Sequence, residues 1–238
     1  VLSGVTTGTS FDLLDGSYAS PYLVRTKMTL QSDGGDGGGG PVFGYRDSKN
    51  YFHVRINQKG GGALDLYEFA TEGNTLLTSA AFKHDVGTEY SVAVEVNGRR
   101  IIVSVDGEVL IDFTLDHDIA EGQTGIRIYH LTADFSEYSV IAGYQSGEVV
   151  SRYLDEEGNA LSDDVTIRRE VGGAYVTEQK SFAGYVLKGV PANASGTVTP
   201  QGAEVIYRYA PAPVATGTVT VNYVDENGDN LKAPVTLE

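Results

Sequence analysis

Aromatic, basic and acidic side chains alternate with apolar ones in three segments of the chain. The polar-side members of this alternation are Tyr51, His53 and Arg55, then Asp65 and Tyr67, then Arg127 and Tyr129. Aromatic rings can stack on the C–H face of a sugar, and arginine and carboxylate groups can hydrogen-bond its neighbouring hydroxyls. A sheet face that gathers these residues could therefore bind a carbohydrate. The same residue types also cover ordinary solvated sheet faces, so a purely structural interpretation stays open.

Arg46 is a further candidate contact, because a guanidinium group matches a pair of vicinal oxygens. It opens the segment 46–50 (RDSKN), which is predicted to be a hairpin turn. In such turns Asp47 and Asn50 commonly hydrogen-bond their own backbone. The candidate ligand-binding set is therefore Arg46, Tyr51, His53, Arg55, Tyr67, Arg127 and Tyr129.

Catalytic chemistry finds little support in the sequence. A glycosidase needs two carboxylates that face each other across a cleft, and Asp65, Glu68 and Glu95 are the available candidates. The chain has no E-x-D-x-x-E run, and its four histidines are scattered. We therefore predict a protein that is not an enzyme and needs no cofactor.

Metal binding is also weakly indicated. The segments DEEGN at Asp155 and DENGD at Asp225 are similar to calcium loops but lack the downstream glutamate of an EF-hand, so they are predicted to be turns. Asp33 and Asp36 could add calcium ligands within a glycine-rich loop. The histidines show no ligand spacing.

The elements that must position these residues are β-strands. Apolar residues alternate over 22–30, 51–56, 91–96, 101–105 and 126–130, and the pairs Asn97-Gly98 and Asp106-Gly107 are hairpin signals. Roughly ten to twelve strands before residue 142 predict an antiparallel β-sandwich or jelly roll. The segment 33–40 (DGGDGGGG) is predicted to be a flexible loop. The predicted core contains Phe52, Val54, Ile56, Val94, Val96, Val103 and Val105.

Residues 147–167 return at 217–237 with nine identities and an offset of 70 residues. A fixed period predicts tandem copies of one small β module. The second copy stops at Glu238, so the chain is expected to be a piece of a longer protein, monomeric within it. The truncated copy cannot bury a full apolar face and is expected to be disordered unless it pairs. The predicted parts are 1–142, a repeat at 143–210, a linker at 211–216 and a truncated repeat at 217–238.

The repeat resembles the MucBP module of Gram-positive surface proteins. The similarity rests on Val149-x-x-x-Tyr153-x-Asp155-Glu156-x-Gly158, Gly184-Tyr185, Val190-Pro191-x-Asn193-Ala194-Ser195-Gly196-Thr197 and Val205-x-Tyr207-x-Tyr209. This resemblance implies a secreted or wall-associated bacterial protein. It does not by itself imply that the repeats bind mucin, because many such modules look like spacers.

Residues 1–142 resemble the laminin-G type of concanavalin-like jelly roll, and within it the family 66 carbohydrate-binding modules. The similarity rests on Gly44-Tyr45-Arg46-Asp47-x-x-Asn50-Tyr51-Phe52-x-Val54-Arg55, Tyr90-x-x-x-Val94-x-Val96-x-Gly98, Val105-Asp106-Gly107-Glu108 and Gly125-x-Arg127. The resemblance implies a non-catalytic module that binds the terminal fructose of levan.

The composition of the chain narrows the classes of molecule that it is expected to bind. The formal charge is −15, from 32 acidic and 17 basic residues, and cysteine is absent. Without a basic face, nucleic acid and anionic membranes are poor partners. A carbohydrate polymer or a host glycan is therefore expected as the ligand, at a bacterial cell surface or cell wall. Two alternatives remain: an adhesin that binds host protein, mucin or a host glycan, and a structural spacer for a missing catalytic domain.

Overall fold

The computed structural model describes all residues except 1, 6–7, 33–34, 58–61, 215–216 and 238, and gives only the backbone of 2–5. The described residues form strands and loops without a helix, which confirms the predicted all-β class. Within these ranges there is accordingly no helix that could cross a membrane. The chain divides into two compact units, residues 1–147 and 148–238, and each unit is described separately.

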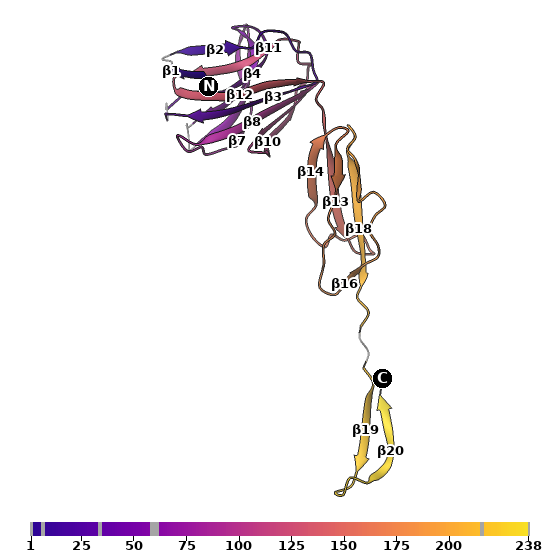
Figure 1. Ribbon diagram of the computed structural model, residues 1–238. Coiled ribbons are helices and arrows are strands. Elements are labelled where there is room, and N and C mark those ends of the chain that lie inside the picture. The colour runs from indigo at the N-terminus through magenta and orange to yellow at the C-terminus, as the bar shows by residue number, and fades with distance from the viewer. Residues whose placement is uncertain (1, 6–7, 33–34, 58–61, 215–216, 238) are drawn as a thin grey trace. The chain divides into compact units, whose positions relative to one another are not determined.

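The first unit is a sandwich of two six-stranded sheets, as predicted (Figure 1). One sheet has the order β1-β12-β3-β8-β9-β10 and the other has the order β2-β11-β4-β5-β6-β7, with antiparallel neighbours throughout. The strands are β1 (Leu2–Val5), β2 (Thr9–Leu13), β3 (Tyr22–Leu30), β4 (Gly38–Asp47), β5 (Asn50–Asn57), β6 (Ala63–Ala70), β7 (Gly73–Ala81), β8 (Glu89–Asn97), β9 (Arg100–Val105), β10 (Glu108–Thr114), β11 (Gln123–Tyr129) and β12 (Thr132–Ala142).

The core lies between these two sheets. All seven predicted core residues are buried there: Phe52, Val54, Ile56, Val94, Val96, Val103 and Val105. Successive side chains of a strand point to opposite faces of the sheet. Burial of Phe52, Val54 and Ile56 therefore directs the intervening His53 and Arg55 to the outer face of the second sheet.

The glycine-rich segment differs from the sequence prediction. Gly38 already belongs to β4, whose backbone pairs with β5 on one side and β11 on the other. Pairing on both sides compensates for the weak strand preference of glycine, so the prediction of a loop continuing to Gly40 was wrong. A Cβ atom at Gly38 would lie 2.5 Å from Cγ of Arg55. The missing side chain therefore leaves room for Arg55 to lie across the strand.

The second unit contains a four-stranded sheet, β14-β13-β18-β16, and a two-stranded sheet, β15-β17. Strand β13 begins in the first unit and runs parallel to β18. Tyr153, Tyr207 and Tyr209 are buried in the core of the second unit. The Oη atom of Tyr207 lies 2.8 Å from Oγ1 of Thr177. The strands are β13 (Ser146–Leu154), β14 (Val165–Glu170), β15 (Ala174–Val176), β16 (Tyr185–Leu187), β17 (Ser195–Thr197) and β18 (Ala203–Pro211).

The second copy of the repeat forms a hairpin, β19 (Val219–Val224) and β20 (Asn230–Leu237). The expectation of disorder was therefore wrong for these strands. Their turn closes locally, because Oδ1 of Asp225 accepts hydrogen bonds from the backbone N–H groups of Asn227 at 2.9 Å and Asp229 at 2.8 Å. The apolar face is nevertheless uncovered, since Tyr223 is 39% exposed whereas the matching Tyr153 is 2% exposed.

Candidate functional site

Five of the seven candidate residues line one pocket on the outer face of the sheet that contains β5, β6 and β11. Its volume is about 460 Å³. Each strand contributes two neighbouring outward positions, because alternate residues share a sheet face. The lining residues are Asp36, His53, Arg55, Tyr67, Phe69, Asn74, Arg127 and Tyr129. We call this space the outer-face pocket.

Arg55 is fixed on one side of the outer-face pocket. Its Nη2 atom donates to Oδ2 of Asp65 at 2.9 Å and to the hydroxyl of Tyr67 at 3.0 Å. The buried Asp65 carboxylate also accepts hydrogen bonds from Asn57 and from Ser79. Since three donors already occupy Asp65, its role is to hold Arg55 in place, and the remaining N–H groups of Arg55 can face a ligand.

Arg127 is held by a neutral histidine. Its Nη1 atom lies 3.2 Å from Nδ1 of His53. Because arginine only donates hydrogen bonds, Nδ1 must accept and the histidine proton must sit on Nε2. The His53 ring is fully buried, and burial, followed by the positive charges of Arg127 and Arg55, holds its pKa well below the ordinary value. His53 therefore forms an uncharged floor of the outer-face pocket.

Aromatic rings surround the Arg127 guanidinium. Its central carbon lies 5.1 Å from the ring centre of Phe69, 5.5 Å from that of Tyr129 and 5.9 Å from that of Phe11. Within the described residues no carboxylate forms an ion pair with Arg127, which is 7% exposed. Burial lowers the pKa of Arg127, but arginine stays protonated in proteins. The rings therefore stabilise a desolvated positive charge.

Tyr51 does not line the outer-face pocket but packs against a residue that does. Its ring stacks on that of Phe69 at 4.3 Å, and Phe11 approaches its edge at 5.2 Å. Burial raises the pKa of Tyr51. Phe11, Phe69 and Asn74 are site residues that the sequence analysis missed. Phe69 is the next outward position after Tyr67, so extending the alternating pattern by two residues would have identified it.

Arg46 is placed differently from the other candidates. It is exposed near the end of β4 and does not line the outer-face pocket. The adjoining turn forms as predicted for Asp47, whose Oδ1 atom accepts hydrogen bonds from the backbone N–H of Lys49 at 2.8 Å and from Nδ2 of Asn50 at 2.9 Å. Asn50 thus bonds to a side chain and not to its own backbone.

The three carboxylates considered for catalysis do not share a cleft. Asp65 and Glu68 lie on opposite faces of β6, where Glu68 Oε1 is 3.1 Å from Nε2 of His117. Glu95 belongs to the other sheet and accepts hydrogen bonds from the backbone and hydroxyl of Ser146.

Of the two calcium candidates, Asp36 lines the outer-face pocket, whereas Asp33 lies outside the described residues. The described ranges contain no cluster of three or more acidic, histidine or cysteine residues that could hold a metal ion. The structure therefore adds no candidate metal site to those considered from the sequence.

Comparison with known proteins first identifies the repeats. The MucBP domain family matches residues 148–210 and 218–238. Internalin J of Listeria monocytogenes serotype 4b is 32% identical over 165 residues, which is 69% of this chain and 16% of that protein. Muramidase-released protein of Streptococcus suis is 37% identical over 90 residues, which is 37% of this chain and 6% of that protein. The chain therefore spans only a small part of these relatives.

The first unit has a known jelly-roll architecture. The carbohydrate-binding module CBM66 from Bacillus subtilis superimposes with a TM-score of 0.52 and 23% identity, covering 59% of this chain and 86% of that module. At this identity the likeness establishes the fold alone. The chain thus combines a CBM66-like jelly roll with MucBP repeats, as the sequence resemblances predicted.

Proposed function

We propose that the first unit is a non-catalytic glycan-binding module whose ligand occupies the outer-face pocket, with a fructan such as levan as the first ligand to test. The observation that carries the proposal is the pair Arg55 and Arg127. Both guanidinium groups are held by neighbouring side chains, so little conformational entropy is lost when a ligand binds. Tyr67, Phe69 and Tyr129 supply ring surface beside them.

The charges around the outer-face pocket favour an uncharged ligand. Arg55 and Arg127 are opposed by Asp65 behind the pocket and by Asp36 in its lining. These two positive and two negative groups offer donors and acceptors without a net formal charge, which suits the hydroxyls of a neutral sugar. The resemblance to CBM66 supports the choice of fructose as the terminal sugar.

The repeats support a location at the bacterial surface. MucBP matches occur together with similarity to Internalin J and to muramidase-released protein. We propose that the protein acts at the cell wall of a Gram-positive bacterium, where the jelly roll would bind its ligand outside the cell and the MucBP repeats would serve as a stalk.

Calorimetry with levan, inulin, a fructose oligomer, host glycans and mucin tests the proposal. Arg55→Ala should weaken levan binding by about 1–3 kcal/mol, because donors to sugar hydroxyls are lost. Arg46→Ala is the matched control, since this exposed arginine lies outside the pocket lining, and it should bind like the wild type. Affinity should change little with salt, because no ion pair to the ligand is screened. Absence of fructan binding at millimolar concentration would reject the fructan assignment.

One observation favours an adhesin as the second candidate. The alignment with Internalin J covers 165 residues, which is more than residues 148–238 can supply, so it includes part of the first unit. The similarity to this relative is therefore not confined to the repeats. Binding to a host glycan or to mucin, without binding to any fructan in the same panel, would favour an adhesive role.

A further inference from the structure

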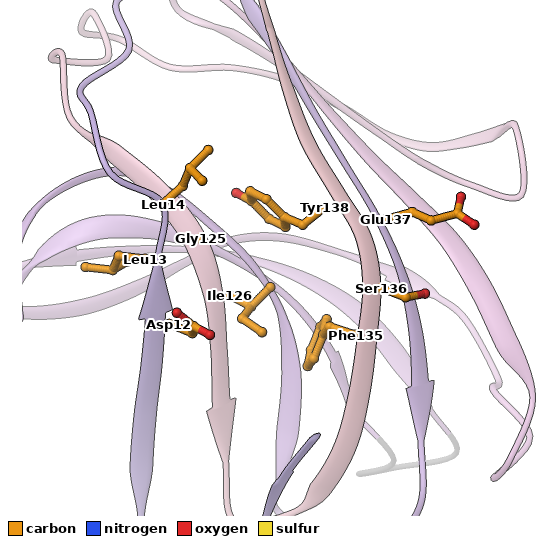
Figure 2. Close-up of a pocket in the computed structure, with 9 residues that line it drawn as sticks. All are labelled: Asp12, Leu13, Leu14, Gly125, Ile126, Phe135, Ser136, Glu137 and Tyr138. Atoms are coloured by element: carbon orange, nitrogen blue, oxygen red, sulfur yellow. The ribbon is translucent and has the colours of Figure 1, made fainter. Parts of the chain in front are cut away.

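A second cavity opens between the edges of the two sheets in the first unit. It has a volume of about 250 Å³ and is formed by β2, β11 and β12 together with Leu14. Figure 2 shows Tyr138 extending from β12 towards Leu14, with Ile126 and Phe135 side by side. Its nine lining residues are Asp12, Leu13, Leu14, Gly125, Ile126, Phe135, Ser136, Glu137 and Tyr138. We call this space the edge cavity; it shares no lining residue with the outer-face pocket.

An irregularity in β12 turns Tyr138 into the edge cavity. The pairing of β12 with β3 shifts between Ser136 and Ser139, and Glu137 has a positive φ of 51°. Outside the sandwich, the Glu137 carboxylate is held by Lys27, whose Nζ atom lies 2.7 Å from Oε1. Bulges commonly re-aim a side chain in this way. Ser136 and Glu137 consequently point away from the edge cavity (Figure 2).

Two buried hydroxyl groups lie at or beside the edge cavity. They belong to Tyr138, which lines it, and to Thr124, and within the described residues the geometry gives neither hydroxyl oxygen a well-formed hydrogen bond. Thr124 precedes the lining residue Gly125, and its hydroxyl acts on the pKa of Tyr138, so these two hydroxyls are close. Burial raises the pKa of Tyr138, which keeps it a neutral donor. Buried polar groups normally have a partner. When two hydroxyls pair with each other, one O–H donor remains free, so the pair can still bind a third polar group.

We propose that the edge cavity binds a small uncharged molecule with an apolar body and one hydroxyl or carbonyl head group. Leu14, Ile126 and Phe135 would enclose the body, and the hydroxyls of Tyr138 and Thr124 would pair with the head. An apolar cavity of about 150 Å³ is enough to bind benzene, so the edge cavity can hold a substituted ring or a short chain. Its lining includes Asp12 but no basic residue, which disfavours an anionic head group.

Three probes of similar size separate these requirements: 4-methylphenol, toluene and 4-methylbenzoate. In a titration followed by NMR, 4-methylphenol should bind saturably in the millimolar range or below, and both toluene and the anion should bind more weakly. Tyr138→Phe keeps the ring and removes the hydroxyl, so it should weaken 4-methylphenol binding by about five-fold and leave toluene binding unchanged. Leu14→Trp should abolish binding of all three probes, because the larger ring would fill the space.

Tyr67→Phe is the matched control, because it removes a tyrosine hydroxyl from the outer-face pocket. It should bind 4-methylphenol like the wild type. The proposal is overturned if 4-methylphenol shows no saturable binding, or if Leu14→Trp and Tyr138→Phe, with an unchanged melting temperature, bind it as the wild type does. Because levan binding is measured at the other pocket, failure of either proposal leaves the other standing.

Discussion

Nη1 of Arg127 lies 3.2 Å from Nδ1 of His53, so a charged side chain in the outer-face pocket rests on a neutral one. The contact needs an unprotonated Nδ1 atom, which burial and the two nearby arginines favour. A protonated His53 would place a third positive charge beside Arg55 and Arg127. The pair therefore links the protonation of one buried ring to the stability of the whole first unit.

Stability should fall at mildly acidic pH because of His53. Its folded-state pKa lies below the ordinary value of about 6.5, so below that pH the unfolded chain binds a proton that the folded chain does not. The free energy of unfolding should then decrease by up to about 1.4 kcal/mol for each pH unit below about 6.5. Urea denaturation between pH 5 and 8 measures this slope.

The variant His53→Gln isolates this contribution, since glutamine retains an acceptor for Arg127 but does not titrate. Burial also lowers the pKa of His84, whereas a hydrogen bond that His117 donates to the Asp116 carboxylate raises the pKa of His117. Both residues remain in the variant, so only the difference between the two slopes belongs to His53. Identical slopes for wild type and variant would contradict the prediction.

Gly38→Ala should weaken ligand binding at the outer-face pocket, although residue 38 does not line that pocket. The new Cβ atom would lie 2.5 Å from Cγ of Arg55, so Arg55 must move from its place beside Asp65. We expect levan affinity to fall about as much as in Arg55→Ala, by about 1–3 kcal/mol. Gly8→Ala is the control, because nothing lies within 4 Å of its added Cβ atom. Equal affinities for both variants would disprove the role of Gly38.

Val103→Ala should destabilise the first unit by about 1–3 kcal/mol, because it opens a cavity between the sheets. Val103 is completely buried and lies opposite Val94 on the adjacent strand. Ile141→Ala removes more apolar volume at a side chain that is 39% exposed and should cost less than about 1 kcal/mol. Chemical denaturation of the two variants should give this order, and the reverse order would mean that the core is wrongly placed.

Tyr207→Phe should destabilise the MucBP repeat by about 1–2 kcal/mol, because it removes a buried hydrogen bond to Thr177. The hydroxyl of Thr177 keeps its bond to the carbonyl of Ala194, so the effect should stay moderate. Hydrogen exchange in β18 of the full chain measures it. Tyr185→Phe, for which the structure gives no side-chain hydrogen bond, should exchange like the wild type. Equal protection in both variants would argue against the proposed contribution of the Tyr207 hydroxyl.

Local sequence patterns were sufficient to predict the sandwich and most of the residues on its outer face. Alternation placed Val54 and Ile56 in the core, and His53 and Arg55 followed on the other face because a strand has a period of two. The same rule predicted which segments would be strands but not their order in the sheets. Bringing Arg127 beside His53 depends on β4 lying between β5 and β11, and pairing between distant segments leaves no local signal.

The glycine-rich segment and the second copy of the repeat show two further limits of prediction from the sequence. Local composition predicted a loop as far as Gly40, but pairing on both sides of β4 makes part of it a central strand. The missing partner for its apolar face predicted that the second copy of the repeat would be disordered unless it pairs, yet the side chain of Asp225 closes its turn. Hydrogen bonds, rather than burial or composition, account for both differences.

The sequence by itself determined the all-β class, the repeat and the residue types of the outer face, because these follow from periodicity and composition. Only the tertiary structure decided that Arg46 stays outside the outer-face pocket, that Tyr51 packs against Phe69 without lining the pocket, and that Phe11 and Asn74 take part. The edge cavity, too, exists only in the tertiary structure, because its walls come from strands that are far apart in the chain. The physical reason is that strand order and bulges set which side chains meet, and neither is encoded in a short stretch of sequence.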